Sequence, residues 1–125
     1  MIPDKLYIEG TLKTPTIKSD SSEGTIEIKG RSHPENPIDF YKPLSDWAAE
    51  YIKDPRGKTI INIQLEHFNT SSSKRILDLL RKFELILMTN NEVQVNWYYD
   101  DEDILEAGET FQTMTRIPFK MIEID

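Results

Sequence analysis

Apolar and polar residues alternate with a period of two over three segments of this chain, residues 25–29, 58–68 and 93–98. In the longest of them, Ile61, Ile63 and Leu65 are separated by polar residues. Successive side chains of a β-strand point to opposite faces of its sheet, so this period is typical of a strand with one buried face. The strict alternation therefore predicts a sheet that is dry on one face only. The predicted strands are residues 6–8, 16–18, 25–29, 58–68, 93–98 and 118–124.

Three other segments repeat their apolar residues at the spacing of an α-helix. The first helix is predicted to begin at Asn36 and Pro37, because Asn is a favoured N-cap and Pro is favoured at the first helical position. Two prolines within residues 30–37 predict no regular element there. The other helices are predicted over residues 71–88 and from 100 to about 113. The predicted buried residues are Phe40, Tyr41, Leu44, Trp47, Ala48, Tyr51 and Ile52 in the first helix and Ile104, Leu105, Ala107, Phe111 and Met114 in the third.

The order of these elements is β-β-β-α-β-α-β-α-β. Turn residues at 21–24 lie between the second and third strands and predict an antiparallel hairpin near the N-terminus. The later alternation of helices and strands favours one mixed β-sheet with helices packed on one face. The chain has 125 residues and neither a repeat nor a linker, so we expect a single α/β domain over residues 1–125.

Composition narrows the classes of function. The net charge of -7 and the isoelectric point near 4.8 disfavour nucleic acids and anionic membranes as partners, because their phosphates would be repelled. The absence of cysteine excludes disulfides, thiolate metal sites and cysteine nucleophiles. The sequence shows neither a signal peptide nor an apolar run of membrane-spanning length, which predicts a cytoplasmic protein.

The junction between the strand at 58–68 and the helix after it is the first candidate for chemistry. Asn, Ser and Thr are favoured at a helix start because their side chains accept hydrogen bonds from free backbone N–H groups, so capping alone is one interpretation. The same N–H groups and the helix dipole attract anions. A hydroxyl at this position is therefore also well placed to carry a phosphate, and a lysine nearby would hold its charge. The junction consists of Asn69, Thr70, Ser71, Ser72, Ser73 and Lys74.

An acidic run at the start of the third helix and two histidines are weaker candidates. Carboxylates complement the dipole of a helix start, and their spacing here does not match a calcium loop, so a solvated helix start is favoured over a metal site, with protein docking as the functional alternative. His33 and His67 lack the spacing of zinc ligands. Neither a glycine-rich phosphate loop nor a nucleophile elbow is present, so we expect no enzyme activity, no cofactor and no metal. The acidic residues are Asp100, Asp101, Glu102, Asp103 and Glu106.

Three blocks of residues follow one another along most of the chain. The first is Gly-Arg-Ser-His-Pro-Glu-Asn-Pro at residues 30–37. The second is Phe-Asn-Thr-Ser-Ser-Ser-Lys at residues 68–74, and the third is Trp-Tyr-Tyr-Asp-Asp-Glu-Asp at residues 97–103. In composition, order and spacing these blocks resemble the SiaC-like family of bacterial regulatory phosphoproteins, formerly a domain of unknown function. The resemblance extends from Thr14 to Phe119.

The resemblance implies a fold similar to STAS domains, the fold of anti-sigma-factor antagonists. It also implies partner switching. In such a system we expect that a dedicated protein kinase phosphorylates the hydroxyl residue after the motif's Asn, that a PP2C-type phosphatase reverses the reaction, and that the unphosphorylated form binds and activates a diguanylate cyclase. The residues implied are Thr70 as acceptor, Ser71, Ser72 and Ser73 as alternative acceptors, and Asn69 and Lys74 as support for the phosphate turn.

The first and third blocks imply a surface for partner docking, although they depart from the family in two respects. Position 33 is His where an aromatic residue is more frequent, and the acidic run is shorter. Three alternatives stay open: an anti-sigma-factor-antagonist-like switch with another target, a carboxylate metal-binding module or small enzyme, and a constitutive scaffold in which the junction is only a helix cap. The docking residues are His33, Glu35, Asn36, Tyr98, Tyr99, Asp100 and Asp101.

Overall fold

The computed structural model describes residues 4–124. Strands and helices alternate along this part of the chain in the predicted order, and a short 3-10 helix follows the second α-helix. The strands are β1 (Lys5–Ile8), β2 (Thr16–Asp20), β3 (Thr25–Ser32), β4 (Lys58–Phe68), β5 (Glu92–Tyr99) and β6 (Phe119–Glu123). The helices are α1 (Pro37–Tyr51), α2 (Thr70–Glu84), the 3-10 helix η1 (Leu85–Thr89) and α3 (Glu102–Met114).

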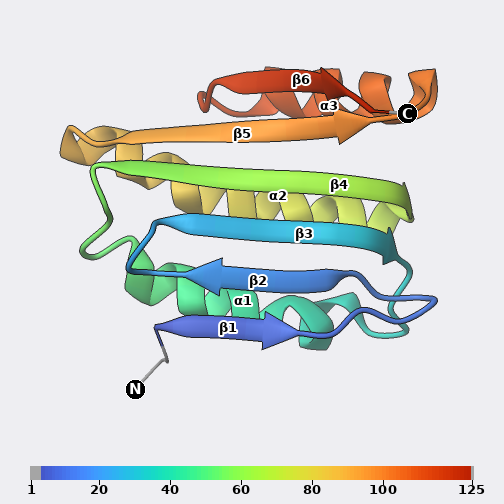
Figure 1. Ribbon diagram of the computed structural model, residues 1–125, viewed down its shortest axis with the longest axis horizontal. Coiled ribbons are helices and arrows are strands. Elements are labelled where there is room, and N and C mark those ends of the chain that lie inside the picture. The colour runs from blue at the N-terminus through green and yellow to red at the C-terminus, as the bar shows by residue number, and fades with distance from the viewer. Residues whose placement is uncertain (1–3, 125) are drawn as a thin grey trace.

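The strands form one six-stranded sheet whose spatial order is the order of the chain (Figure 1). Strands β1, β2 and β3 pair antiparallel, as the turn at residues 21–24 predicted. Strands β3, β4, β5 and β6 pair parallel, and each parallel pair is connected through one of the helices α1, α2 and α3. The sheet is therefore mixed, which confirms the predicted fold class.

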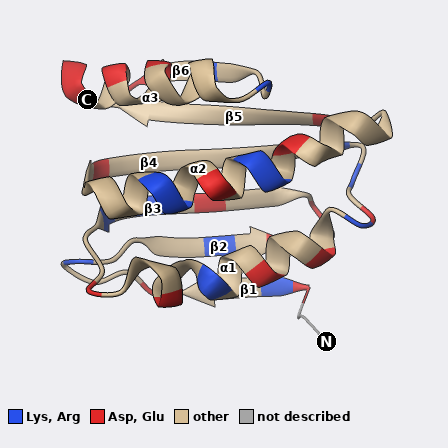
Figure 2. Cartoon of the chain, turned by 180° about the vertical axis from the view of Figure 1, so that it is seen from behind, with Lys and Arg blue, Asp and Glu red and all other residues tan. Residues whose placement is uncertain are grey.

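All three α-helices cover the same face of the sheet, which Figure 2 shows from the helical side. In β4, Ile61, Ile63 and Leu65 face the helices and are at most 3% exposed, whereas Asn62 and Gln64 lie on the other face and are half-buried. The period-two pattern thus correctly predicted which face of β4 is buried. The largest fully buried side chains between sheet and helices are Trp47, Trp97 and Phe83.

The elements differ from the sequence prediction in three places. Strand β3 continues to Ser32, although the nearby prolines predicted no regular structure from Gly30 onward. A bulge between Gly30 and Arg31, with a φ of +127° that glycine tolerates, lets the strand continue before Pro34 interrupts it. The second α-helix ends at Glu84, and the last turns predicted for it belong to η1. Met114 was predicted to be buried, but it is the last residue of α3 and is 47% exposed.

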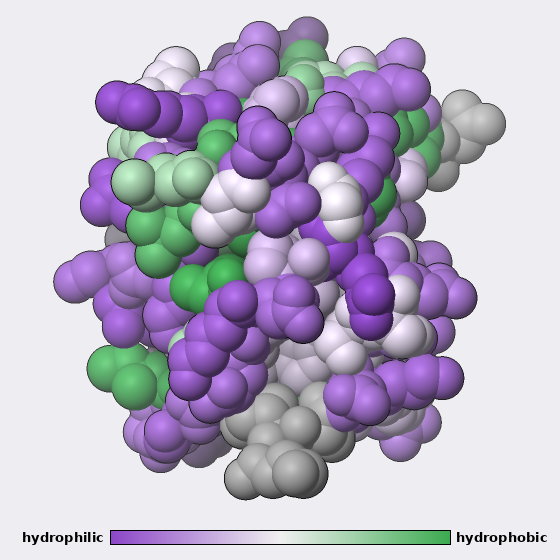
Figure 3. Space-filling model, turned by 90° about the vertical axis from the view of Figure 1, so that its left-hand side faces the viewer, coloured by the Kyte–Doolittle hydropathy of each residue, from purple (hydrophilic) through white to green (hydrophobic). Residues whose placement is uncertain are grey.

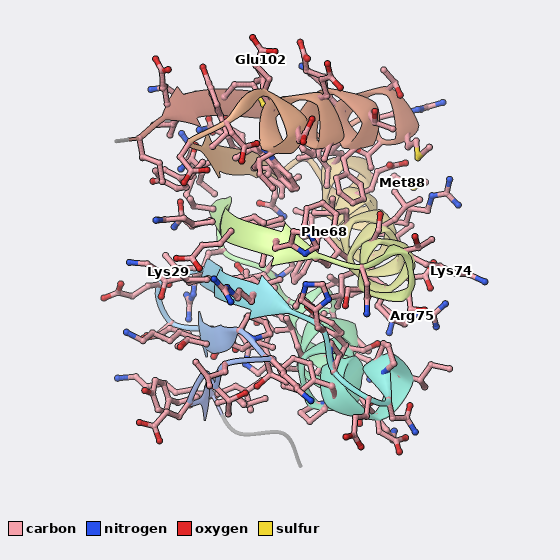
Figure 4. All side chains as sticks on the ribbon, turned by 90° about the vertical axis from the view of Figure 1, so that its right-hand side faces the viewer. Lys29, Phe68, Lys74, Arg75, Met88 and Glu102 are labelled. Atoms are coloured by element: carbon pink, nitrogen blue, oxygen red, sulfur yellow. The ribbon has the colours of Figure 1, made fainter. Side chains whose placement is uncertain are left out.

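Parallel pairing places three strand-to-helix connections at the same end of the sheet, where the carboxyl ends of β3, β4 and β5 lie. We call this end of the sheet the carboxyl edge. It comprises the β3–α1, β4–α2 and β5–α3 connections, lies on the right of Figure 1 and faces the viewer in Figure 4. The opposite edge is mostly hydrophilic with separate hydrophobic patches (Figure 3). Exposed Leu85 and Met88 belong to the α2–β5 connection on that side. Binding residues in open α/β sheets are usually found at the carboxyl ends of the strands.

Candidate functional site

The carboxyl edge brings together the residues that sequence analysis selected from three separate blocks. The β4–α2 connection, with Asn69 and Thr70, lies in the middle because β4 lies between β3 and β5. One side is formed by the β3–α1 connection and the other by the end of β5 and the β5–α3 connection. The flanking residues are His33, Glu35 and Asn36 on the first side and Tyr98, Tyr99, Asp100 and Asp101 on the second.

Each connection ends in a side chain that caps the following helix. Asn36 Oδ1 accepts a hydrogen bond from the backbone N–H of Asp39 at 3.2 Å, and Asp101 Oδ1 accepts one from that of Ile104 at 2.9 Å. Asn69 Oδ1 accepts a hydrogen bond from the backbone N–H of Ser72 at 2.8 Å. The cap of α2 is therefore Asn69, so capping accounts for Asn69 but not for the hydroxyl that follows it.

The first turn of α2 differs in charge from those of the other two α-helices. Asp39 lies in the first turn of α1, and Glu102 and Asp103 lie in that of α3, whereas α2 has no acidic residue there. The first charged residues of α2 are basic (Figure 2). The first four N–H groups of a helix have no acceptor within it. At this helix start those of Asn69 and Ser72 bond to the Ser32 carbonyl oxygen and to Asn69 Oδ1, which leaves those of Thr70 and Ser71. The positive end of α2 therefore lacks a carboxylate of its own to neutralise it.

The two basic residues near this helix start are arranged differently. Arg75 forms an ion pair with Asp78, with 3.3 Å between guanidinium nitrogen and carboxylate oxygen. Figure 4 shows Lys74 extending outward from α2, away from Phe68 at the end of β4. Lys74 is exposed. Its positive charge adds to that of the helix N-terminus, because the first turn of α2 contains no carboxylate.

The four hydroxyl residues after Asn69 differ sharply in exposure. Thr70 and Ser71 are exposed, Ser73 is half-buried, and Ser72 is completely buried. Within residues 4–124, the Thr70 hydroxyl has no hydrogen-bond partner. A kinase that acts on the folded protein can reach the side chains of Thr70 and Ser71, but not that of Ser72.

Ser72 instead belongs to a buried chain of hydroxyl groups that joins three elements. Its Oγ donates to the backbone carbonyl oxygen of Ser32 at 3.0 Å. Ser32 Oγ donates to Ser72 Oγ at 2.8 Å, and it is 2.5 Å from the hydroxyl of Tyr41. Because the Ser32 hydrogen is already used toward Ser72, Tyr41 is the donor in the last of these bonds. This network fixes the first turn of α2 to the end of β3 and to α1.

Burial raises the pKa of Tyr41 to about 12, although its hydrogen bond with Ser32 acts in the opposite direction. Tyr41 therefore remains a neutral donor at physiological pH. The helical periodicity of α1 predicted a buried Tyr41, but no sequence pattern indicated Ser32 as its partner. The available signal was the tyrosine itself, because a phenol within an apolar helix face requires a buried hydrogen-bond partner.

The histidines and the acidic run have different surroundings. His33 and His67 lie against each other, although their positions in the sequence did not indicate contact. In the acidic run, Asp101 is the cap of α3, and Glu102 and Asp103 occupy its first turn. Among residues 4–124, no three His, Asp or Glu side chains form a cluster that could hold a metal ion. In the same range, no helix is long and apolar enough to cross a membrane.

The sequence pattern of the SiaC family of regulatory phosphoproteins matches residues 8–124. The chain belongs to this family. An uncharacterized protein of Pseudomonas aeruginosa is 31% identical to this SiaC-family protein over 116 residues, which are 91% of this chain and 92% of that protein. The family resemblance noted from the three sequence blocks is therefore confirmed.

Solved structures agree with the family assignment. The crystal structure of apo-SiaC from P. aeruginosa has a TM-score of 0.87 at 30% identity and covers 94% of this chain and 98% of its own. A chain in the crystal structure of the diguanylate cyclase SiaD in complex with its activator SiaC, from the same bacterium, has a TM-score of 0.89 at 30% identity. That match covers 95% of this chain and 99% of the other. This SiaC-family protein therefore has the SiaC fold.

Proposed function

We propose that this SiaC-family protein is a phosphorylation-controlled, protein-binding switch with Thr70 as its phosphoacceptor. The observation that carries the proposal is the start of α2, where an exposed Thr70 hydroxyl lies at a helix N-terminus that has no acidic residue in its first turn. Such a terminus stabilises a dianionic phosphate through free N–H groups and the helix dipole. Asn69 Oδ1 caps the first turn, and Lys74, four residues after Thr70 in the same helix, adds positive charge.

Exposure orders the alternative acceptors. Ser72 is excluded in the folded state because its hydroxyl is buried and both donates and accepts hydrogen bonds. Ser71 is exposed but is one residue further into the helix. Ser73 is half-buried. Thr70 is the hydroxyl nearest to the middle of the carboxyl edge, directly after the capping Asn69.

The proposed output is the binding and activation of a diguanylate cyclase by the unphosphorylated form. The support is the likeness to SiaC of P. aeruginosa, which is described as the activator of the cyclase SiaD in their complex. The protein acts in the cytoplasm by binding rather than by catalysis. A dedicated kinase would add the phosphate, and a PP2C-type phosphatase would remove it.

A phosphate on Thr70 would change the middle of the carboxyl edge. It adds bulk and up to about two negative charges between the flanking segments. A partner that packs against the free hydroxyl would then have to accommodate this group and remove its hydration, which is costly for a charged group without a matched cation. The exposed carboxylates of Glu35, Asp100 and Asp101 on the flanks would add to the negative charge of this surface.

The acceptor is tested by intact-mass analysis after incubation with the kinase of the same organism and ATP. The wild type should gain the mass of one phosphate, and Thr70→Ala should gain none. Ser71→Ala is the matched control, because it removes a neighbouring exposed hydroxyl and should leave the gain unchanged. A phosphate that persists in Thr70→Ala, or is lost only in Ser71→Ala, would contradict the assignment.

The output is tested separately by mixing unphosphorylated and phosphorylated protein with the diguanylate cyclase of the same organism. The unphosphorylated form should co-elute with the cyclase and raise its rate of cyclic-di-GMP synthesis, and the phosphorylated form should do neither. If phosphorylation at Thr70 occurs but the cyclase responds equally to both forms, the switch acts on a different target, and the cyclase part of the proposal is wrong.

A further inference from the structure

His33 and His67 are the only two histidines of the chain, and the fold places them in contact. They are 34 positions apart, His33 after the end of β3 and His67 near the end of the neighbouring strand β4. The bulge at Gly30 and Arg31 shifts the register so that Arg31 lies opposite His67. A backbone hydrogen bond of 2.6 Å from His33 N–H to the Lys13 carbonyl oxygen holds the His33 backbone to the β1–β2 connection.

The two imidazole rings meet at their nitrogen-bearing edges. His33 Nε2 and His67 Nδ1 are 2.5 Å apart, while the ring centroids are 4.6 Å apart and the planes differ by 24°. Rings packed face to face would keep their atoms about 3.5 Å or more apart, so the contact is a hydrogen bond between ring edges. One nitrogen donates its hydrogen, and the other offers its lone pair.

Both rings open onto a surface hollow of about 640 Å³. Leu12 and Lys13 of the β1–β2 connection, and the ion pair between Arg31 and Glu66, form the rest of its wall. In that ion pair, Arg31 Nε is 3.3 Å from Glu66 Oε2. The His33 side chain is half-buried and that of His67 is exposed, so an ion from solvent can reach the two nitrogens.

We propose that His33 and His67 form a binding site for a divalent metal ion that prefers imidazole ligands, such as Zn²⁺, Ni²⁺ or Cu²⁺. Neutral imidazole nitrogens are preferred ligands of Zn²⁺, Ni²⁺ and Cu²⁺. Zinc–nitrogen bonds of about 2.0–2.1 Å in tetrahedral geometry place two ligand nitrogens about 3.3 Å apart. The nitrogens of His33 and His67 therefore need to separate by less than about 1 Å from their present 2.5 Å, which side-chain rotation supplies.

Water completes the coordination, because the chain supplies two imidazole ligands and no third histidine. The nearby charges oppose one another: Lys13 and Arg31 weaken the attraction of a cation, and the carboxylate of Glu66 strengthens it. The site is therefore a weak, exchangeable one that responds to the free concentration of the metal. A bound ion would join the ends of β3 and β4, two residues before Asn69.

Calorimetric titration of the full chain with Zn²⁺ tests the site. The wild type should bind one ion, and His33→Gln and His67→Gln should each weaken binding by at least about tenfold, since each leaves a single imidazole. Glu102→Gln is the matched control, because it removes a carboxylate from the acidic run at the other side of the edge, and it should bind zinc as the wild type does. Far-UV circular dichroism checks that each variant is folded.

Proton NMR of the imidazole rings provides an independent measurement of metal binding. The chain has only two histidines, so their ring signals can be followed separately. Zinc should shift the ring signals of both together, at the same ratio of metal to protein. The proposal is overturned if zinc binding is unchanged in both His variants, if it is lost in Glu102→Gln, or if only one ring responds. None of these results bears on Thr70, so the site and the phosphorylation switch stand or fall separately.

Discussion

Ser32 and Ser72, 40 positions apart in the chain, are joined by two hydrogen bonds at the base of the carboxyl edge. Ser72 Oγ donates to the Ser32 carbonyl oxygen at 3.0 Å, and Ser32 Oγ donates to Ser72 Oγ at 2.8 Å. Both side chains are completely buried. The pair therefore attaches the first turn of α2 to β3 and holds in place the helix turn that carries the Thr70 hydroxyl.

Removing the buried hydroxyl of Ser72 should destabilise the fold. In Ser72→Ala, Ser32 Oγ loses its acceptor inside the protein, and leaving a buried polar group without a partner costs about 1–3 kcal/mol. Ser71→Ala, on the exposed side of the same turn, should change the free energy of unfolding by less than about 0.5 kcal/mol. Urea unfolding followed by circular dichroism compares the two. Equal losses in both variants would mean that the buried network does not fix this turn.

Tyr41 should make stability depend on alkaline pH. Its pKa is about 12 in the folded state and close to 10 when unfolded, so the unfolded state loses this proton first as the pH rises. The stabilising contribution is complete below pH 10 and is lost between pH 10 and 12, by about 2–3 kcal/mol in all. Tyr41→Phe should be less stable at neutral pH because a buried hydrogen bond is missing.

The pH dependence is checked by measuring urea midpoints of the wild type and Tyr41→Phe across this range. The two proteins differ only at this side chain, so the difference between their stabilities isolates Tyr41. The stability gap should narrow as the pH rises above 10. A gap that stays constant to pH 12 would show that the buried phenol does not resist ionisation.

Phosphothreonine at position 70 should be more acidic than in a flexible peptide. The second pKa of such a phosphate is ordinarily about 6, and a helix N-terminus favours the dianion, so the pKa should fall below that value. Phosphorus-31 NMR titration of the phosphorylated protein measures it. A phosphopeptide spanning residues 66–78 is the matched reference because it lacks the folded helix. Identical titration curves would show that the start of α2 does not stabilise the phosphate.

Gly108 should tolerate no side chain, although it lies inside α3. A Cβ there would be 2.5 Å from Trp97 Cδ1 and Nε1, and that indole is held by a 2.8 Å hydrogen bond from Nε1 to the Ile104 carbonyl oxygen. Alanine improves helix propensity by about 1 kcal/mol, but overpacking costs about 1–3 kcal/mol and should prevail. Gly57→Ala is the control, because a Cβ at Gly57 meets nothing within 4 Å. Thermal unfolding should show a lower Tm for Gly108→Ala only.

Local patterns predicted the fold well because each of them acts over a few neighbouring residues. The alternation around Ile63 selected the buried face of β4, and Asn36 with Pro37 marked the start of α1. The failures involve partners distant in the chain. Strand β3 reaches Ser32 only because β4 lies beside it and a bulge absorbs the irregularity. No local pattern carries that information.

The candidate site was predictable in its position and not in its supporting contacts. Asn69 stands at a recognisable helix start, whereas the helix start alone left capping as an alternative and Thr70 was singled out by the resemblance to the SiaC family. The burial of Ser72 and the contact of His33 with His67 depend on the register between the parallel strands β3 and β4. That register depends on packing between segments that are distant in the chain, which no local pattern records.

The three connections of the carboxyl edge also determine which form of the chain a modifying enzyme can recognise. Thr70 has its surroundings only after β3, β4 and β5 have paired, and each pairing closes a long crossover through a helix. A nascent or unfolded chain contains the same Asn-Thr-Ser-Ser-Ser-Lys segment but no such surface. If Thr70 is the phosphoacceptor as proposed, its kinase would recognise a conformational epitope and would modify only copies of the protein that have finished folding.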